Sequence, residues 1–332
     1  MFFHNYLSMD KYTKIIGIDI SKDVFDVSDM DDRHMQFLNT VKGFKNFLKS
    51  ISPNAICVME ATGYYHIQLA YYLLEHNVSV SIVNPLSVKR FIQMKLSKIK
   101  TDKSDAKMIR LYGQNNELKL WKGNSKNQTA SLQIARLLDN YTKQTTALKN
   151  KIHGEITLGK PAPVVLKSLK RSLKFLQKEK KLLEEKLEAL VKEEHSTMLS
   201  NLESIPGMGR KTASLLIVYT DAFSRFDSAS ALCSYCGITP IIRQSGSSVN
   251  SRPRISKMGN QKLRNLLFLC SFTASIHNKA CKAIYQRITN KGKSKKLALI
   301  AVSNKLLKQA FAIAKSGIPY DSEYQSALGS VH

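Results

Sequence analysis

The chain has 332 residues, and its 43% apolar content supports two domains with cores of their own and excludes a disordered protein. Its 51 Lys and Arg residues outnumber its 25 Asp and Glu residues, which gives a formal net charge of +26. A field of this strength suits a polyanionic partner. No apolar run approaches the roughly 20 residues that span a bilayer, and the first residues lack a signal-peptide pattern. We therefore expect a cytoplasmic protein with no membrane partner.

The positive charge is concentrated in two parts of the sequence. Residues Ser228 to Tyr320 contain sixteen Lys or Arg and no Asp or Glu. Residues Val88 to Lys126 contain eleven Lys or Arg, and their only acids are Asp102, Asp105 and Glu117. Acids placed in such a basic stretch call for an explanation.

The five cysteines indicate a reduced protein. Their number is odd and their spacing irregular, which fits free thiols better than a disulfide framework. Cys233 and Cys236 form a CxxC pair, but a zinc site would need two further ligands, for which Cys270 and Cys281 qualify only by position. We expect a buried structural pair instead.

The first third of the chain alternates strand and helix patterns. Strands are predicted at 13–19, 23–30 and 34–40 as an antiparallel meander, and a helix at 43–51. A buried strand at 55–60, a helix at 64–75, a strand at 78–83, a helix after Pro85 and another from about Thr101 follow. This order, βββαβαβα, matches the ribonuclease H-like fold, a mixed sheet flanked by helices in which carboxylates converge on metal ions.

Four acids occupy the positions that such a site needs. Asp19 ends the first strand, Glu60 ends the fourth, and Asp102 and Asp105 lie on one face of a helix. Hard cations prefer carboxylate oxygens, and two Mg²⁺ ions about 4 Å apart are a common device for phosphoryl transfer on DNA. We therefore predict that these four acids bind two Mg²⁺ ions.

Each acid also has a simpler explanation. Thr101 or Asp102 could cap a helix, Asp19 could belong to a turn, and Glu60 could be an ordinary strand-end residue. Their combination on one scaffold favours the metal site. The hairpin acids are expected to be solvated: Asp23, Asp26 and Asp29.

Beyond Trp121 the pattern is helical. Apolar residues recur at heptad spacing from Leu169 to Leu190, which is typical of a short coiled coil. We expect self-association, the alternative being a long helix packed within its own chain. The predicted domains are residues 1–125, a RuvC-like catalytic domain; 126–200, a helical coiled-coil region; and 201–332, a mainly α-helical domain.

Two segments of the last domain indicate nucleic-acid chemistry. In SIPGMGRKTASLLI, Ser204 to Ile217, a Pro-Gly-x-Gly turn joins two helices and resembles a helix-hairpin-helix, with Arg210 and Lys211 adding charge. The alternative is a plain connector. A Ser- and Gly-rich loop follows Gly237, and a hydroxyl nucleophile there could be Ser245, Ser247 or Ser248.

Several motifs in this order resemble the insertion-sequence 110/1111 family of transposases. They are GIDISKD, MEATG and TDKSDAKMI in the first part, then IPGMGRKTA, CGITP, QSG and ISKMGNQKLR. The resemblance covers nearly the whole chain and implies a RuvC-like DEDD tetrad that binds Mg²⁺, a covalent serine–DNA intermediate and guidance by a bridge RNA. It places the nucleophile at Ser245, although Gln244 and Ser247-Ser248 depart from the Ser-Ser-Gly-Gly that relatives often have.

The resemblance also implies a composite site between subunits, hence a dimer or tetramer, in a bacterial, nucleoid-associated protein. Arg243, Arg252 and Arg254 are expected to steady phosphorane charge, and Lys257, Lys262 and Arg264 to hold the DNA backbone. Two alternatives remain: a RuvC-like junction resolvase that hydrolyses DNA, and a non-catalytic nucleic-acid-binding relative.

Overall fold

A computed structural model describes residues 14–61, 63–96, 101–241, 244–245, 249–250 and 254–323. The chain divides into two compact units, Met1–Asn124 and Ser125–His332. Each unit has its own hydrophobic core.

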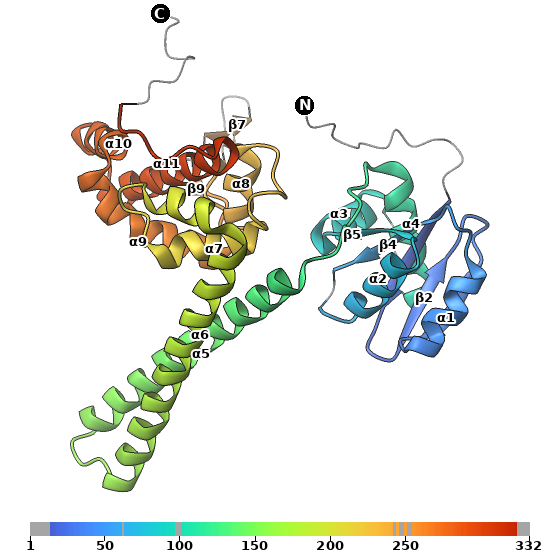
Figure 1. Ribbon diagram of the computed structural model, residues 1–332, viewed down its shortest axis with the longest axis horizontal. Helices are drawn as coiled ribbons and strands as arrows, with labels where there is room; N and C mark the ends of the chain where they lie inside the picture. Colours follow the sequence, from blue (N-terminus) through green and yellow to red (C-terminus); the bar gives the residue numbers. More distant parts are fainter. Residues whose placement is uncertain are drawn as a thin grey trace, which may run out of the picture. The chain divides into compact units, whose positions relative to one another are not determined.

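The first unit is a five-stranded sheet with helices on both faces (Figure 1). Its elements are β1 (Ile15–Ile20), β2 (Val24–Ser28), β3 (His34–Leu38), α1 (Val41–Ser50), β4 (Ile56–Glu60), α2 (His66–Glu75), β5 (Ser79–Val83), α3 (Pro85–Met94) and α4 (Asp102–Asn115). The predicted strand and helix order is confirmed, and each boundary differs from its prediction by a few residues at most.

The sheet has the strand order β3-β2-β1-β4-β5. β1, β2 and β3 form the predicted antiparallel meander, whereas β1, β4 and β5 run parallel. Because β4 is buried along most of its length, its continuous apolar sequence ICVME suits a central strand covered on both faces.

Two apolar layers cover the two faces of this sheet. One contains Ile18 and Phe25 with Phe44 and Phe47 of α1 and Leu69 of α2. The other, smaller layer joins Ile15 and Val58 to Val88 of α3 and Ile109 of α4. Since side chains alternate along a strand, Gly17 and Asp19 share the α4 face with Ile15.

The second unit is mainly helical. Its helices are α5 (Lys126–Thr157), α6 (Pro163–Glu203), α7 (Arg210–Thr220), α8 (Ala229–Cys236), α9 (Gln261–His277), α10 (Lys279–Asn290) and α11 (Lys295–Ser316). Two short ribbons lie between α8 and α9. They are formed by β6 (Pro240–Ile241) with β9 (Arg254–Ile255), and by β7 (Gln244–Ser245) with β8 (Val249–Asn250).

The predicted heptad segment lies in α6, which packs along α5 as a helical hairpin (Figure 1). At its carboxyl-terminal end Leu187 and Val191 join the core of the second unit, together with Leu138 of α5. This end of the heptad segment is therefore buried against other helices of the same chain. Self-association through the remainder stays a prediction.

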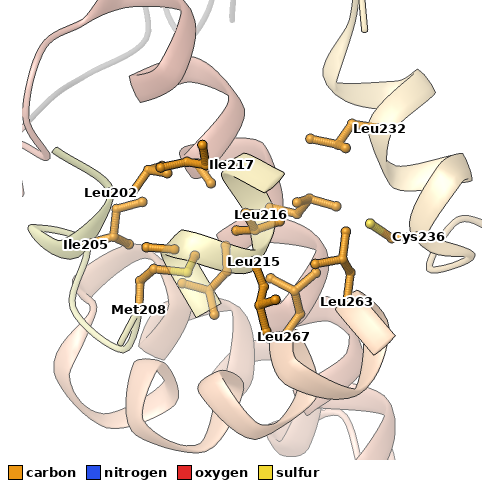
Figure 2. Close-up of a cluster of buried hydrophobic side chains, with 14 of the residues drawn as sticks. Leu202, Ile205, Met208, Leu215, Leu216, Ile217, Leu232, Cys236, Leu263 and Leu267 are labelled. Carbon is orange, nitrogen blue, oxygen red and sulfur yellow. The ribbon is translucent and has the colours of Figure 1, made fainter. Parts of the chain in front are cut away.

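The core of the second unit surrounds α7. Leu215, Leu216 and Ile217 of α7 are buried between Leu202 of α6 and Leu263 of α9 (Figure 2). Cys233 and Cys236 of α8 are buried in the same core, and burial raises the pKa of both thiols, that of Cys236 to about 12. The CxxC pair is thus part of the packing.

Within the described residues, one helix, α11, has the length and composition of a membrane span, contrary to the expectation that no segment would approach one. Its buried residues include Val302, Leu306 and Leu307, all in the core of the second unit. A central helix of a folded core meets the same criteria, and burial explains its apolar sequence here.

Candidate active site and nucleic-acid interface

Asp19 and Glu60 lie side by side at the carboxyl edge of the sheet. β1 and β4 are parallel neighbours in which Ile18 is opposite Met59, so the following residues, Asp19 and Glu60, continue the same register. Both side chains are half-buried. The strand-end placement expected from the sequence is thus observed.

Gly17 brings α4 to these two acids. A Cβ on Gly17 would lie 2.2 Å from the Ala106 carbonyl oxygen and 2.3 Å from the Arg110 nitrogen, so no other residue permits this approach. Thr101 caps α4, and its capping box with Ser104 fixes where the helix begins. Asp102 and Asp105 lie in the first turn. The capping and site interpretations of this segment are therefore compatible.

The charges of these acids act on Asp19. Burial raises the pKa of Asp19 to about 6, and repulsion by Asp105, Glu60 and Asp102, in that order, adds to the effect. The other three predicted acids therefore lie close enough to Asp19 for their charges to affect it. Among the described residues, however, no three His, Cys, Asp or Glu side chains lie close enough together to hold a metal ion as they stand.

A fifth acid, Asp26, was wrongly expected to be solvated. It is directly opposite Asp19 on β2, only 4% exposed, and also raises the pKa of Asp19. Its Oδ1 lies 2.7 Å from His34 Nε2 and accepts a hydrogen bond of 3.1 Å from Gln36 Nε2. The alternating polar residues His34 and Gln36 on the paired strand were the sequence signal for a buried partner.

A second anchor holds α4 against the sheet. Asp32, in the turn between β2 and β3, forms ion pairs with Lys107 at 2.8 Å and with the buried guanidinium of Arg110. Asp32 has a φ of 60°, a conformation that Asp and Asn tolerate better than most residues.

In the second unit, the IPGMG turn joins α6 to α7. Gly207 has a φ of 98°, and a Cβ there would lie 2.7 Å from the Ala274 nitrogen of α9, so this glycine is required for packing. Gly209 is the N-cap of α7 and has open space around it. Of these two glycines, only Gly209 lies in open space, so the N-terminus of α7 is accessible to a ligand at Gly209.

Of the six predicted basic contacts that the structure describes, four already have partners within the chain. Arg210 pairs with Glu203 at 2.6 Å, Lys211 pairs with Glu184, and Lys262 pairs with Asp139 at 3.0 Å. Arg264 Nη1 donates to the Cys236 carbonyl oxygen at 2.9 Å. Arg243 and Arg252 lie outside the described residues.

The candidate nucleophile, Ser245, lies in the segment between α8 and α9 that forms the two short ribbons. The backbone of Ser245, in β7, pairs with Val249 of β8, whereas Ser247 and Ser248 lie outside the described residues. The base of this segment is tightly built: a Cβ on Gly259 would lie 2.1 Å from the Tyr235 carbonyl oxygen, which accepts a 2.7 Å bond from the Asn260 nitrogen. The CGITP and SKMGN motifs therefore pack against each other.

Comparison with known proteins places the chain in a family. Residues 16–160 match the DEDD domain model of IS110 elements, described as a transposase, and residues 199–286 match the model described as the transposase IS116/IS110/IS902 family. The pilin gene-inverting protein of Moraxella lacunata is 31% identical over 319 residues, which cover 92% of this chain and 97% of the relative.

A second relative is the transposase for insertion sequence element IS1111A of Coxiella burnetii. It is 26% identical over 331 residues, covering 88% of this chain and 83% of the relative. Both parts of the chain thus match DNA-rearranging enzymes, and the chain belongs to the IS110 family of transposases.

Proposed function

We propose that this transposase cuts and rejoins DNA through a covalent bond to Ser245, assisted by a Mg²⁺-binding site formed by Asp19, Glu60, Asp102 and Asp105. The observation that carries the proposal is the placement of Asp19 and Glu60 at the ends of the parallel neighbours β1 and β4, with Asp102 and Asp105 in the first turn of α4. Burial raises the pKa of Asp19, and the charges of the other three acids add to this effect. Such an accumulation of negative charge is unfavourable alone and favourable around divalent cations. The strand order β3-β2-β1-β4-β5 supports our assignment of an RNase H/RuvC-like fold.

The donor set suits magnesium by its chemistry. All four groups are carboxylates, the ligands that Mg²⁺ takes most readily, and Asp19 and Glu60 come from rigid neighbouring strands. When bound, the metal would neutralise charge that develops on the reacting phosphate. Because the acids do not close around an ion as they stand, we infer that Asp102 and Asp105 adjust at the start of α4 when metal binds.

The covalent step conserves a phosphate ester. Ser245 Oγ would attack phosphorus and form a serine–phosphate bond, while the bond from phosphorus to a deoxyribose oxygen breaks and that oxygen receives the serine proton. Attack by a deoxyribose hydroxyl on the serine ester would reverse the exchange and rejoin a strand. No energy source is needed, because one phosphodiester replaces another. Arg243, Arg252 and Arg254 would stabilise the charge of the pentavalent transition state.

The partners follow from charge and from family membership. We infer that the IPGMG turn acts as a helix-hairpin-helix on the DNA backbone, with Arg210 and Lys211 exchanging carboxylate partners for phosphates. Lys257, Lys262 and Arg264 would support the same DNA. We also propose a bridge RNA, a dimer or tetramer that completes the site, and a cytoplasmic, nucleoid-associated location.

The covalent step is tested on a denaturing gel with labelled DNA carrying the element ends. We expect a protein–DNA adduct with the wild type and the Ser247→Ala and Ser248→Ala variants, but none with Ser245→Ala. An adduct that disappears only in one of the other two variants would reassign the nucleophile. Cleaved DNA without any adduct would favour a hydrolytic, resolvase-like reaction, and binding without cleavage would favour a non-catalytic relative.

The metal site is tested by Asp102→Asn in the same assay. We expect loss of Mg²⁺-dependent cleavage with DNA binding retained, because the substitution removes a metal-binding charge and leaves the Thr101 cap intact. Unchanged metal-dependent strand exchange in this variant would contradict the site. The matched control is Asp23→Asn, an exposed acid between β1 and β2.

A further inference from the structure

A large groove in the second unit contains Arg254 and Lys257, but its other cations have no assigned role. It has a volume of about 1240 Å³ and lies between α8, α10, α11 and the β6–β9 ribbon. That volume exceeds the roughly 300–1,000 Å³ typical of small-molecule pockets, so a segment of a polymer is a better match in size. Six cations line it: Arg254, Lys257, Arg287, Lys296, Lys305 and Lys308.

These cations differ from three of the basic residues that the sequence predicts to bind DNA. Arg210, Lys211 and Lys262 each have a carboxylate partner, whereas none of the six groove cations has one among the residues that the structure describes. Among the described residues, no Asp or Glu lines the groove. The groove therefore presents positive charge that the chain itself does not neutralise, as expected for a surface that binds phosphates.

The floor of the groove is apolar. It includes Ile238, Ile255 and Ile300, which also line a smaller cavity of about 190 Å³ next to it. The remaining residues that line this side pocket are Arg264, Asn265, Phe268, Lys296 and Ser303. An apolar cavity of about 150 Å³ holds one benzene molecule, so the side pocket has room for one aromatic ring system.

We propose that this groove binds a single strand of DNA, with phosphates over the six cations and one unpaired base in the side pocket against Phe268. A duplex keeps its bases stacked inside and would not place one in a recess of this size. Aromatic side chains stack on bases of any sequence, and Asn265 offers an amide donor and acceptor for a base edge. The groove thus recognises a strand that is already unpaired, or unpairs one base of it.

The position of the groove connects it to the reaction. β6 and β9 contribute Pro240 and Arg254 to its wall, and the segment between these strands carries Ser245. A strand held in the groove therefore lies beside the base of the segment that would attack DNA. This inference rests on the proposed function for the choice of DNA over RNA, and strand binding itself is measurable without cleavage.

The experiment measures binding of a fluorescent DNA strand by anisotropy. The strand is about 20 nucleotides long, more than the roughly 4–16 nucleotides of typical single-strand sites. Its duplex and an RNA of the same sequence are compared in the Asp19→Asn background, which prevents turnover. We expect Lys305→Ala/Lys308→Ala to weaken strand binding about tenfold and to lower the salt slope by roughly 1.4, since each lost phosphate contact on a single strand accounts for about 0.7.

The base pocket is tested separately by Phe268→Leu and Asn265→Ala. Loss of stacking should weaken strand binding about tenfold in Phe268→Leu, with little effect on duplex binding. Asn265 is exposed, so its truncation should not disturb folding. A weakening equal for strand and duplex, or no weakening in either variant, would overturn the base pocket.

The matched control is Lys174→Ala/Lys178→Ala, which removes the same charge from exposed positions on α6 outside the groove. An equal loss of binding in this control would overturn the groove as the strand site, and so would tighter binding of RNA than of DNA. Ser245→Ala should bind the strand normally. If the wild type binds the strand in the groove but forms no covalent adduct, the proposed function fails and the groove assignment stands. If the adduct forms but the groove variants bind the strand normally, the groove assignment fails and the proposed function stands.

Discussion

Asp105, in the first turn of α4, has the largest charge effect on Asp19 of any acid around it. The two residues come from elements that are distant in sequence and that meet only because Gly17 lets α4 contact β1. Repulsion between them means that the metal-free protein is destabilised by the same charges that its chemistry requires.

Asp19→Asn should therefore stabilise the metal-free protein at neutral pH. The pKa of Asp19 is raised from 3.8 to about 6, so its favourable contribution is complete below 3.8 and is lost as pH rises through 6. An uncharged Asn avoids this loss. In EDTA, the variant should show a higher Tm than the wild type at neutral pH, and the difference should vanish near pH 3.8.

Added Mg²⁺ should then raise the Tm of the wild type and not that of Asp19→Asn, because ligand binding stabilises the state that binds it. Asp23→Asn, at an exposed position, is the control and should follow the wild type. A lower Tm for Asp19→Asn in EDTA at neutral pH would show that the acids do not repel each other as described.

Gly17→Ala should separate α4 from the sheet. The added Cβ would meet the Ala106 oxygen and the Arg110 nitrogen, which are backbone atoms that cannot rotate away. We expect a loss of about 1–3 kcal/mol in the free energy of unfolding, typical of overpacking, together with loss of cleavage. Urea denaturation measures the first effect.

Gly154→Ala is the matched control for that substitution. Gly154 lies within α5 with nothing within 4 Å of an added Cβ. Alanine there should stabilise the protein by up to about 1 kcal/mol, since glycine is a poor helix former. If both variants were equally stable, the close contact of α4 with β1 would be wrong.

The first unit was largely predictable because its pattern is local. Short apolar segments bounded by turn residues located β1 and β2, and acids at the ends of β1 and β4 marked the carboxyl edge. Asp26 was misjudged for the opposite reason. Its burial depends on pairing with His34 and Gln36 across two strands, and hairpin acids without such partners are usually solvated.

The second unit shows a different limit of prediction. Heptad spacing indicates that a helix face is buried but does not name its partner, and at Leu187 that partner is the chain's own core. Likewise the sequence identifies Lys262 as basic but not its pairing with Asp139, which is 123 residues away. The groove cations are spread from Arg254 to Lys308 and become a group only on folding.

Asp32→Asn should destabilise the first unit in a pH-dependent way. A hydrogen bond from Lys107, with the charge of Arg110, lowers the pKa of Asp32 below 3.8. The stabilising contribution is therefore present above pH 3.8 and lost as pH falls through the lowered pKa. Asn tolerates the same positive φ, so the substitution isolates the charge.

Thermal unfolding across pH tests this prediction. Asp32→Asn should melt below the wild type at neutral pH and approach it in acid. Asp31→Asn is the comparison, because Asp31 pairs with Arg33 where both side chains are exposed, and such pairs contribute little. A larger effect at Asp31 than at Asp32 would contradict the role of the buried Arg110.

Gly209→Asp should separate folding from DNA binding at the IPGMG turn. Gly209 is the N-cap of α7 with open space around it, and Asp is among the best N-cap residues, so the variant should fold at least as well as the wild type. Its carboxylate would nevertheless repel a phosphate at the helix N-terminus. We expect weaker duplex binding with an unchanged or higher Tm.

Gly209→Asn completes the comparison, because it caps the helix equally well without a charge. The Asn variant should bind DNA nearly as the wild type does, and only the Asp variant should show a weaker dependence of affinity on salt, as expected when a phosphate contact is lost. Equal losses of DNA affinity in both variants would mean that the size of the added side chain, and not its charge, weakens binding. Equal and normal binding in both would mean that the N-terminus of α7 does not contact phosphate, and the helix-hairpin-helix assignment would then be abandoned.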